Sequence, residues 1–234
     1  MGSGRKAAVW AGGIIFSVCF IITALISSFE IGAYGNFGFY QKEYEKYNVL
    51  EDLNMEMPDV MYVTKEMMSF LRGDRENLIV ETKVNGETRE FFNEDEISHM
   101  EDVKKLFVGG LRLRMVMIVV MVLLIAAALL AKARIRKIWP RAFQYTSVAL
   151  TVITGIVIGL FASNFDKYFV VFHEIFFSQG NWLFDPDVSL MINMLPEGFF
   201  ADIAARIGIL FVGILVVSFI LATVIRVWDR RKES

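Results

Sequence analysis

The sequence has very little histidine and almost no cysteine. Its 234 residues include two histidines, His99 and His173, and one cysteine, Cys19. A single cysteine excludes an internal disulfide and any cysteine-based zinc site. Cys19 stands within a long apolar run, where the sequence indicates a small buried hydrophobic side chain rather than a reactive thiol.

Several familiar functional patterns are also missing. The sequence contains no Gly-x-Ser-x-Gly motif, no glycine-rich phosphate-binding loop and no repeat that relates its two halves. None of its long apolar segments carries a charged residue near the middle. Transporters, channels and pumps need polar groups at membrane depth, so this last absence argues against those classes.

Apolar residues, in contrast, are abundant. They make up 55% of the chain, whose mean hydropathy is +0.48, and this indicates a membrane protein with a substantial aqueous part. A spanning helix needs about 20 apolar residues. Four segments meet this requirement: 7–29, 111–131, 143–163 and 203–225. The first is too long for a cleaved signal peptide and lacks a cleavage pattern, so we expect it to be retained.

Basic residues predict the orientation of these spans. Arg5 and Lys6 precede the first span, the loop 132–142 holds five basic residues and no acid, and four more basic residues stand in the tail 226–234. The positive-inside rule then places both termini and this loop in the cytoplasm. The acidic segment 30–110 and the aromatic segment 164–202 fall outside. We therefore predict a mainly α membrane protein with four transmembrane helices, a small α+β extracellular cap between helices 1 and 2, and an aromatic outer loop between helices 3 and 4.

Local patterns suggest how the cap is built. Asn85-Gly86 is typical of a type I′ turn and predicts a β-hairpin within 77–92. Thr64 and Asn93 are suitable helix N-caps, and Gly109-Gly110 predicts a bend before the second span. With that bend, the preceding helix would lie along the membrane surface. The helices expected in the cap cover 39–53, 65–71 and 94–107, and Gly73 is expected to end the second of them.

Both histidines lie just outside the predicted membrane, at the edges of apolar segments. His99 falls within the apolar face of 94–107, and His173 lies beside a phenylalanine stripe in 165–177. A helix is expected to begin at Asp185-Pro186, after an aromatic loop, and to end at Leu195-Pro196. Apolar surroundings keep an imidazole neutral, which is the form that a general base needs. The alternative is that both histidines are packed within an ordinary interfacial aromatic belt.

A metal site is the competing chemical interpretation. His99, Asp102 and His173 together form a set of two histidines and a carboxylate, which suits zinc or iron. Nothing in the sequence fixes their geometry, however, and we predict no metal site.

Two stretches carry a family resemblance. One is His173-Glu174-Ile175-Phe176-Phe177-Ser178-Gln179-Gly180-Asn181-Trp182-Leu183-Phe184-Asp185-Pro186, together with Leu195-Pro196-Glu197-Gly198-Phe199-Phe200; the other runs from Asn93 to Lys104. With the four spans, they make the whole chain similar to the lipoprotein intramolecular transacylases of Gram-positive bacteria. The resemblance implies a bacterial cell-membrane enzyme, with His99 and His173 as its catalytic residues. Its substrates would be lipoproteins whose N-terminal cysteine carries a diacylglyceryl group. The implied reaction moves the sn-2 acyl chain onto the α-amine of that cysteine and gives the lyso-form lipoprotein.

Elementary chemistry is compatible with that reaction. Acyl transfer from an ester to an amine is downhill, so no cofactor, nucleotide or metal is expected. Donor and acceptor belong to one molecule, so no acyl-enzyme is required. One histidine would take the proton of the amine, and the other would polarise the carbonyl or protonate the leaving oxygen. The expected substrate-binding residues are Phe172, Phe176, Asn181, Trp182, Phe184 and Tyr40, with Asp102 and Asp166 orienting the histidine rings.

Diacylglyceryl-modified lipoproteins and membrane lipids are the expected partners, without nucleic acid, and the sequence leaves the oligomeric state open. Two other functions also remain open at this stage. One is a non-catalytic membrane subunit that docks a partner protein, and the other is a metal-dependent membrane hydrolase.

Overall fold

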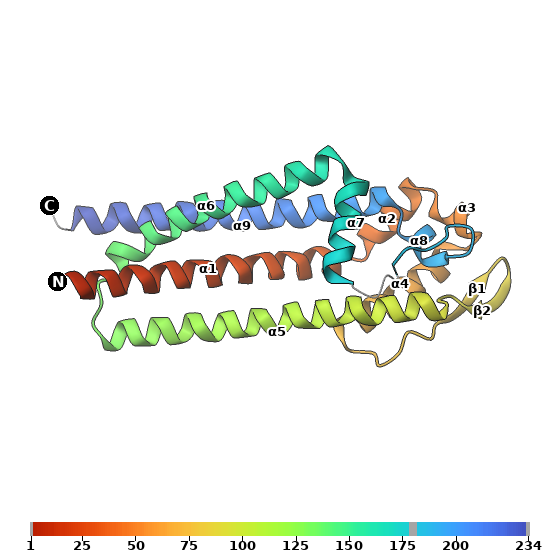
Figure 1. The fold of residues 1–234 in the computed structure, drawn as a ribbon, viewed down its shortest axis with the longest axis horizontal. Helices are drawn as coiled ribbons and strands as arrows, with labels where there is room; N and C mark the ends of the chain where they lie inside the picture. The colour runs from red at the N-terminus through yellow and green to blue at the C-terminus, as the bar shows by residue number, and fades with distance from the viewer. Residues whose placement is uncertain (1, 178–181, 233–234) are drawn as a thin grey trace. The chain divides into compact units, whose positions relative to one another are not determined.

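The computed structural model describes residues 2–177 and 182–232, without the side chains of Ile158, Phe161, Ala162, Phe165 and Asp166. The described chain is mainly helical, with one antiparallel pair of strands (Figure 1).

The chain divides into two compact units. The bundle unit contains Met1–Phe29, Arg112–Phe165 and Gly208–Ser234; the cap unit contains Glu30–Leu111 and Asp166–Ile207. The elements are α1 (Ser3–Tyr34), α2 (Gly38–Lys46), α3 (Val49–Leu53), α4 (Met57–Arg72), β1 (Glu81–Val84), β2 (Glu87–Glu90), α5 (Glu94–Leu130), α6 (Ile135–Ser163), α7 (Phe165–Phe176), α8 (Leu190–Met194) and α9 (Glu197–Arg231).

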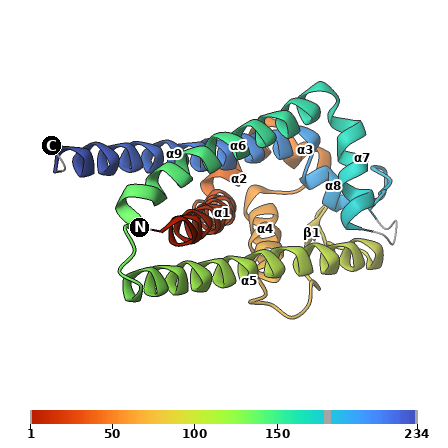
Figure 2. The same cartoon turned by 60° about the vertical axis from the view of Figure 1, so that its left-hand side comes forward.

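Long helices form the bundle unit. Both chain termini and the link between α5 and α6 lie at the same end of it in two views (Figures 1 and 2). Among the described residues, α1, α5 and α9 are long and apolar enough to cross a membrane. Many of their apolar side chains are exposed, as expected where lipid replaces water. The fourth span, 143–163 in α6, stays a prediction.

Aromatic side chains join α1 and α6 in the bundle. The rings of Phe20 and Phe143 meet edge to face at 5.6 Å, and the ring of Phe16 stacks on Trp139 at 5.0 Å. The indole N–H of Trp139 donates to the carbonyl oxygen of Val9 at 3.1 Å. Gly13 permits this approach, because a Cβ there would stand 2.9 Å from the Trp139 ring.

The cap unit has its own core, built around tyrosines of α2. Tyr40 and Tyr44 are almost fully buried, and the hydroxyl of Tyr44 lies 2.7 Å from that of Thr64 in α4. The ring of Phe199, at the start of α9, packs 5.5 Å from Tyr40. The predicted helix 39–53 is in fact two helices. Asn48, between α2 and α3, has a positive φ of 55°, which interrupts a right-handed helix.

The predicted helix 65–71 begins earlier than expected, and the N-cap assigned to Thr64 is wrong. In the structure α4 starts at Met57, with Pro58 in its first turn, where a missing N–H costs nothing. The hydroxyl of Thr64 instead donates to the carbonyl of Val60, one turn back. The predicted end is confirmed, because Gly73 has the left-handed conformation of a helix C-cap, with φ of 90°.

The β-hairpin is confirmed. Asn85 and Gly86 both have positive φ, 55° and 81°, as a type I′ turn requires. Val84 pairs with Glu87 across the turn, so the loop between the strands has two residues.

Gly109 and Gly110, where a bend was predicted, do not interrupt the helix. Helix α5 runs unbroken from Glu94 to Leu130. A glycine inside a helix costs only about 1 kcal/mol relative to alanine, which is too little to break a helix that apolar residues support on both sides. The segment 94–107 is therefore the first part of a long helix, and its orientation along the membrane surface stays a prediction.

The segment after α7 also differs from the prediction in one respect. The helix expected at Asp185-Pro186 starts at Leu190, where the hydroxyl of Ser189 caps it by accepting from the N–H of Ile192 at 3.3 Å. The carboxylate of Asp185 instead accepts from the N–H of Asp187 in a turn. The expected stop before Pro196 is confirmed, since α8 ends at Met194.

Candidate active site

The two histidines lie against each other within the cap unit. His99 comes from the first turns of α5 and His173 from the last turn of α7. Their ring centroids are 6.1 Å apart, with ring planes inclined by 27°. His99 is 7% exposed and His173 8%, so both imidazoles are largely shielded from solvent. The fold thus brings together the two histidines of the chain from separate parts of the sequence.

Aromatic rings surround this pair. The ring of Phe177 lies 4.8 Å from His99 and 5.3 Å from His173, so it contacts both. Phe184 meets His99 edge to face at 5.6 Å, and Trp182 lies 4.9 Å from His173. We call these residues, with Phe169 and Phe172, the aromatic wall. Such a wall lowers the local dielectric and strengthens the electrostatic interactions that form inside it.

The backbone fixes the orientation of His173. Its Nδ1 lies 2.7 Å from the carbonyl oxygen of Phe169, one turn earlier in α7. A carbonyl only accepts, so Nδ1 carries the hydrogen and Nε2 carries the lone pair. The rings of these two residues also pack 3.9 Å apart. His173 is therefore held as the tautomer whose Nε2 can accept a proton.

His99 is in a different environment. Its Nδ1 is buried and has no hydrogen-bond partner within the described part of the chain. Burial lowers the pKa of His99 to about 4, with a further lowering from neighbouring His173 and a partial opposite effect of Asp102. Burial also lowers the pKa of His173, partly opposed by its hydrogen bond to Phe169. Both imidazoles are thus neutral at pH 7, and His99 has an unused polar atom.

A buried carboxylate ties the His99 helix to the loop of α8. Glu96, one turn before His99, is 1% exposed. Its Oε1 accepts from the hydroxyl of Ser189 at 2.5 Å and from the N–H of Met191 at 3.1 Å, and its Oε2 accepts from the N–H of Asn93 at 2.8 Å. Asn93 in turn accepts from the N–H of Glu96 at 2.9 Å, which completes a capping box.

Two of the expected substrate-binding residues, Phe172 and Phe176, lie in α7. The ring of Phe172 meets His173 at 5.4 Å and Phe176 at 4.7 Å, while Phe176 is 51% exposed at the outer side of this cluster. Tyr40 lies elsewhere, in the core of the cap, where its hydroxyl donates to the carbonyl of Ala33 at 3.0 Å.

The two residues expected to orient the histidine rings are Asp102 and Asp166, and Asn181 was expected to bind substrate. The carboxylate of Asp102 pairs with Lys105 at 2.8 Å, and it acts on His99 through its charge rather than through a bond to Nδ1. Asn181 and the side chain of Asp166 are outside the described residues. Within the described residues, no three histidine, cysteine or carboxylate side chains form a metal-binding group.

Three residues that touch the pair or its helix were not among the expected site residues, although Phe169 belongs to the phenylalanine stripe expected beside His173. Phe169 and Phe177 stand four residues before and after His173, a spacing that places them next to it on a helix. Glu96 stands three residues after the predicted N-cap Asn93, which is the spacing of a capping box. Both signals were present in the sequence, whereas the contact of Glu96 with Ser189 depends on long-range folding.

Comparisons with known proteins show what the fold and the sequence are similar to. The structure is similar to that of the membrane-integral lipoprotein intramolecular transacylase Lit from Bacillus cereus, with a TM-score of 0.78, 21% identity and coverage of 98% of this chain and 100% of that one. A structure of the same enzyme with a histidine-to-alanine mutation matches at 18% identity with a TM-score of 0.76, covering 98% of each chain. No curated protein gives a significant match. The family model of the lipoprotein intramolecular transacylase Lit matches residues 14–200, most of the chain. The chain therefore belongs to the Lit family of lipoprotein intramolecular transacylases.

Proposed function

We propose that this protein moves the sn-2 acyl chain of a diacylglyceryl-cysteine lipoprotein onto the α-amine of the same cysteine. The observation that carries the proposal is the pair of neutral histidines, one held in a single tautomer, behind an aromatic wall. The reaction needs a proton acceptor for the amine and a hydrogen-bond donor for the carbonyl oxygen. Two neutral imidazoles supply one of each.

His173 is the proposed general base. Its Nε2 carries the lone pair because Nδ1–H donates to the carbonyl of Phe169. The amine nitrogen attacks the ester carbonyl and a C–N bond forms, while the amine proton passes to Nε2. When the C–O bond to the glycerol breaks, the resulting imidazolium returns a proton to the leaving oxygen. The step therefore balances without any external proton source.

His99 is the proposed electrophile. Its low pKa keeps the imidazole neutral, and its Nδ1 has no partner among the described residues. A neutral imidazole N–H can donate to the carbonyl oxygen as negative charge develops there, as in other enzymes that use a histidine with a lowered pKa. Removing one such donor elsewhere costs about 2.7–4 kcal/mol of transition-state stabilisation.

The aromatic wall is proposed to hold the lipid part of the substrate. Trp182, Phe184 and Phe177 lie next to the imidazoles, where acyl and glyceryl carbons would meet apolar surface. Holding the amine against the ester within one molecule can contribute up to about 7–11 kcal/mol. Nothing in this scheme requires a cofactor.

The decisive experiment follows the substrate by mass. Intramolecular transfer produces an isomer, so the intact mass of a diacylglyceryl lipopeptide should stay constant while tandem mass spectrometry locates an acyl group on the amine. A hydrolase would instead lower the mass by one acyl chain, and a docking subunit would leave the fragments unchanged. Either of those results contradicts the proposal.

A mixture of deuterated and unlabelled lipopeptides tests whether the transfer is intramolecular. We expect no product in which a deuterated acyl chain sits on an unlabelled peptide. Such a crossed product would mean that the acyl chain leaves its own molecule.

A further inference from the structure

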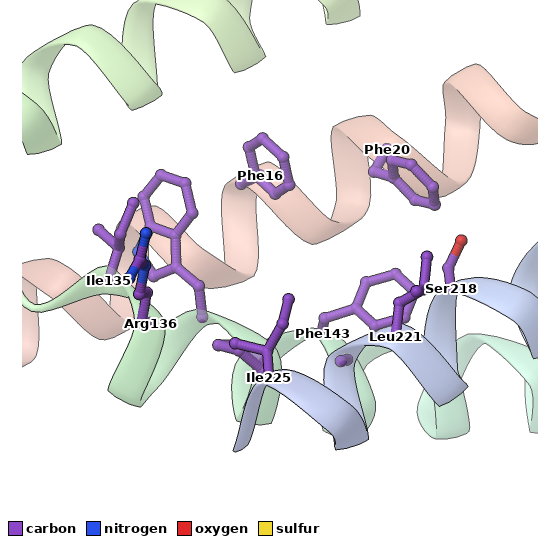
Figure 3. Close-up of a pocket in the computed structure, with 11 residues that line it drawn as sticks. Phe16, Phe20, Ile135, Arg136, Phe143, Ser218, Leu221 and Ile225 are labelled. Carbon is purple, nitrogen blue, oxygen red and sulfur yellow. The ribbon is translucent and has the colours of Figure 1, made fainter. Parts of the chain in front are cut away.

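An apolar groove lies in the bundle unit, separate from the histidine site. It has a volume of about 330 Å³ and is bordered by α1, the start of α6 and the last turns of α9 (Figure 3). Its walls are aromatic and aliphatic, with Phe16, Phe20, Trp139 and Phe143 among them. The polar lining residues are Arg136 and Ser218. The groove thus combines a hydrocarbon lining with a guanidinium.

The groove lies at the basic end of the bundle. Helix α6 contributes its first turns to it, directly after the link that joins α5 and α6. That link and the start of α6 hold Lys132, Arg134, Arg136, Lys137 and Arg141 without an acid, and the last turns of α9 add Arg226, Arg230 and Arg231 against Asp229. An anionic group at this end would therefore be favoured over a neutral or cationic one.

Arg136 has donors available for such an anion. Its guanidinium lies over the ring of Trp228 at 5.7 Å, a contact that uses none of its five N–H donors. Two other arginines of the bundle unit, in contrast, donate hydrogen bonds within the protein. Arg5 donates to the carbonyl of Ala131, and Arg226 donates to the side chain of Gln144.

We propose that this groove binds an anionic phospholipid, with one acyl chain between α1, α6 and α9 and the phosphate at Arg136. The volume suits a hydrocarbon chain but not a further helix, whose diameter is about 10–12 Å. Two of the helices that border the groove, α1 and α9, are long and apolar enough to cross a membrane, where acyl chains are the surrounding solvent. The guanidinium can bind a phosphate diester through two donors. In an anionic phospholipid no headgroup cation offsets the phosphate charge, whereas phosphatidylethanolamine carries an ammonium that does, so the anionic lipid is favoured.

Tryptophan fluorescence can test this directly, because Trp139 is part of the groove wall. The full chain is placed in phosphatidylcholine nanodiscs that contain a minor amount of a second lipid with brominated acyl chains, which quench nearby indoles. The second lipid is either phosphatidylglycerol or phosphatidylethanolamine. The Trp139→Phe variant identifies the share of the signal that comes from this residue.

We expect brominated phosphatidylglycerol to quench Trp139 more effectively than brominated phosphatidylethanolamine. About one fifth as much phosphatidylglycerol should give the same quenching, which is the preference expected from one basic side chain at an anionic headgroup. Arg136→Gln should abolish the preference, whereas Arg134→Gln, an equal change of charge at a residue outside the groove lining, should keep it. Equal quenching by both lipids in the wild type would overturn the proposal. An equal loss in both variants would also do so, because it would indicate diffuse charge rather than a site.

A second pair of variants tests the place of the acyl chain without altering charge. Ser218 lines the groove, and the adjacent Val217 is exposed on α9. Ser218→Phe should reduce quenching of Trp139 by both brominated lipids, whereas Val217→Phe should not. If Ser218→Phe is quenched like the wild type, no chain enters the groove and the proposal fails.

Discussion

His99 and His173 differ in what holds each ring, and this difference sets their expected roles. A main-chain carbonyl fixes Nδ1 of His173, whereas Nδ1 of His99 has no partner within the described residues. Substitution of either by alanine should lower the rate of acyl transfer by about 100- to 10,000-fold, a range that covers the loss of a general base and the loss of a donor to the carbonyl oxygen. Tandem mass spectrometry of the lipopeptide product measures this.

The double variant provides the stricter test of the pair. The effects of residues that act as a unit on one catalytic step are strongly non-additive, so His99→Ala with His173→Ala should be scarcely slower than either single change. Asp102→Asn, which alters a nearby charge that is paired with Lys105, should have a smaller effect and serves as the matched control. Rates near the wild type in either single histidine variant, with the fold intact, would leave that residue as a packed aromatic-belt side chain.

The buried His99 should also make stability depend on pH. Unfolded, its pKa is about 6.5, but in the folded chain burial lowers it to about 4. The unfolded state thus binds the proton first, and stability is lost as the pH falls from about 6.5 towards 4. His99→Gln should remove roughly 1–2 kcal/mol of this loss at about pH 4.5, after allowance for partial exposure. Thermal unfolding of both proteins across this range measures the difference, and parallel pH curves would contradict it.

At the scale of elements, the side chain of Glu96 joins α5, the helix that carries His99, to the start of α8. Its two oxygens accept three hydrogen bonds in a buried place. In Glu96→Gln an NH2 group replaces one carboxylate oxygen, so at least one of the three hydrogen-bond donors faces another donor and loses its acceptor. This should lower the free energy of unfolding by about 1–3 kcal/mol. Transfer activity should fall with it, because His99 stands one turn away.

Glu101→Gln is the control for this change, since Glu101 is an exposed acid on the same helix. It should leave the melting temperature and the transfer rate unchanged. A Glu96→Gln protein with wild-type stability and activity would show that the contact with Ser189 does not hold the site together.

The elements that the sequence predicted well are those specified by neighbouring residues. Asn85-Gly86 determines a hairpin by itself, and Gly73 ends a helix by its own conformational freedom. Errors arose where a local signal competed with longer-range contacts. Gly109-Gly110 does not break α5, and Thr64 bonds within α4 and to Tyr44 instead of capping a helix. Pairing of the histidines depends on the fold as a whole, and no local pattern predicts a distance of 6.1 Å between their rings.

At the scale of the whole molecule, the orientation in the membrane stays a prediction that rests on basic residues. In a Cys19→Ser background, Glu87→Cys places a thiol in the hairpin and Lys132→Cys places one in the link between α5 and α6. We expect an impermeant thiol reagent on intact cells to label the first and to reach the second only after permeabilisation. The reverse pattern would place the cap unit in the cytoplasm and contradict the proposed reaction at the outer surface.

The cap unit is assembled from two separate stretches of chain, and each contributes one histidine. During synthesis His99 is therefore made well before its partner. At ordinary rates of about 5–20 residues per second, the ribosome needs about 4 to 15 s to pass from one histidine to the other. A nascent or truncated chain that ends before α7 holds only one of them. The pairing of the histidines is thus completed late in biogenesis, and in the proposed mechanism an unfinished chain in the membrane is catalytically silent.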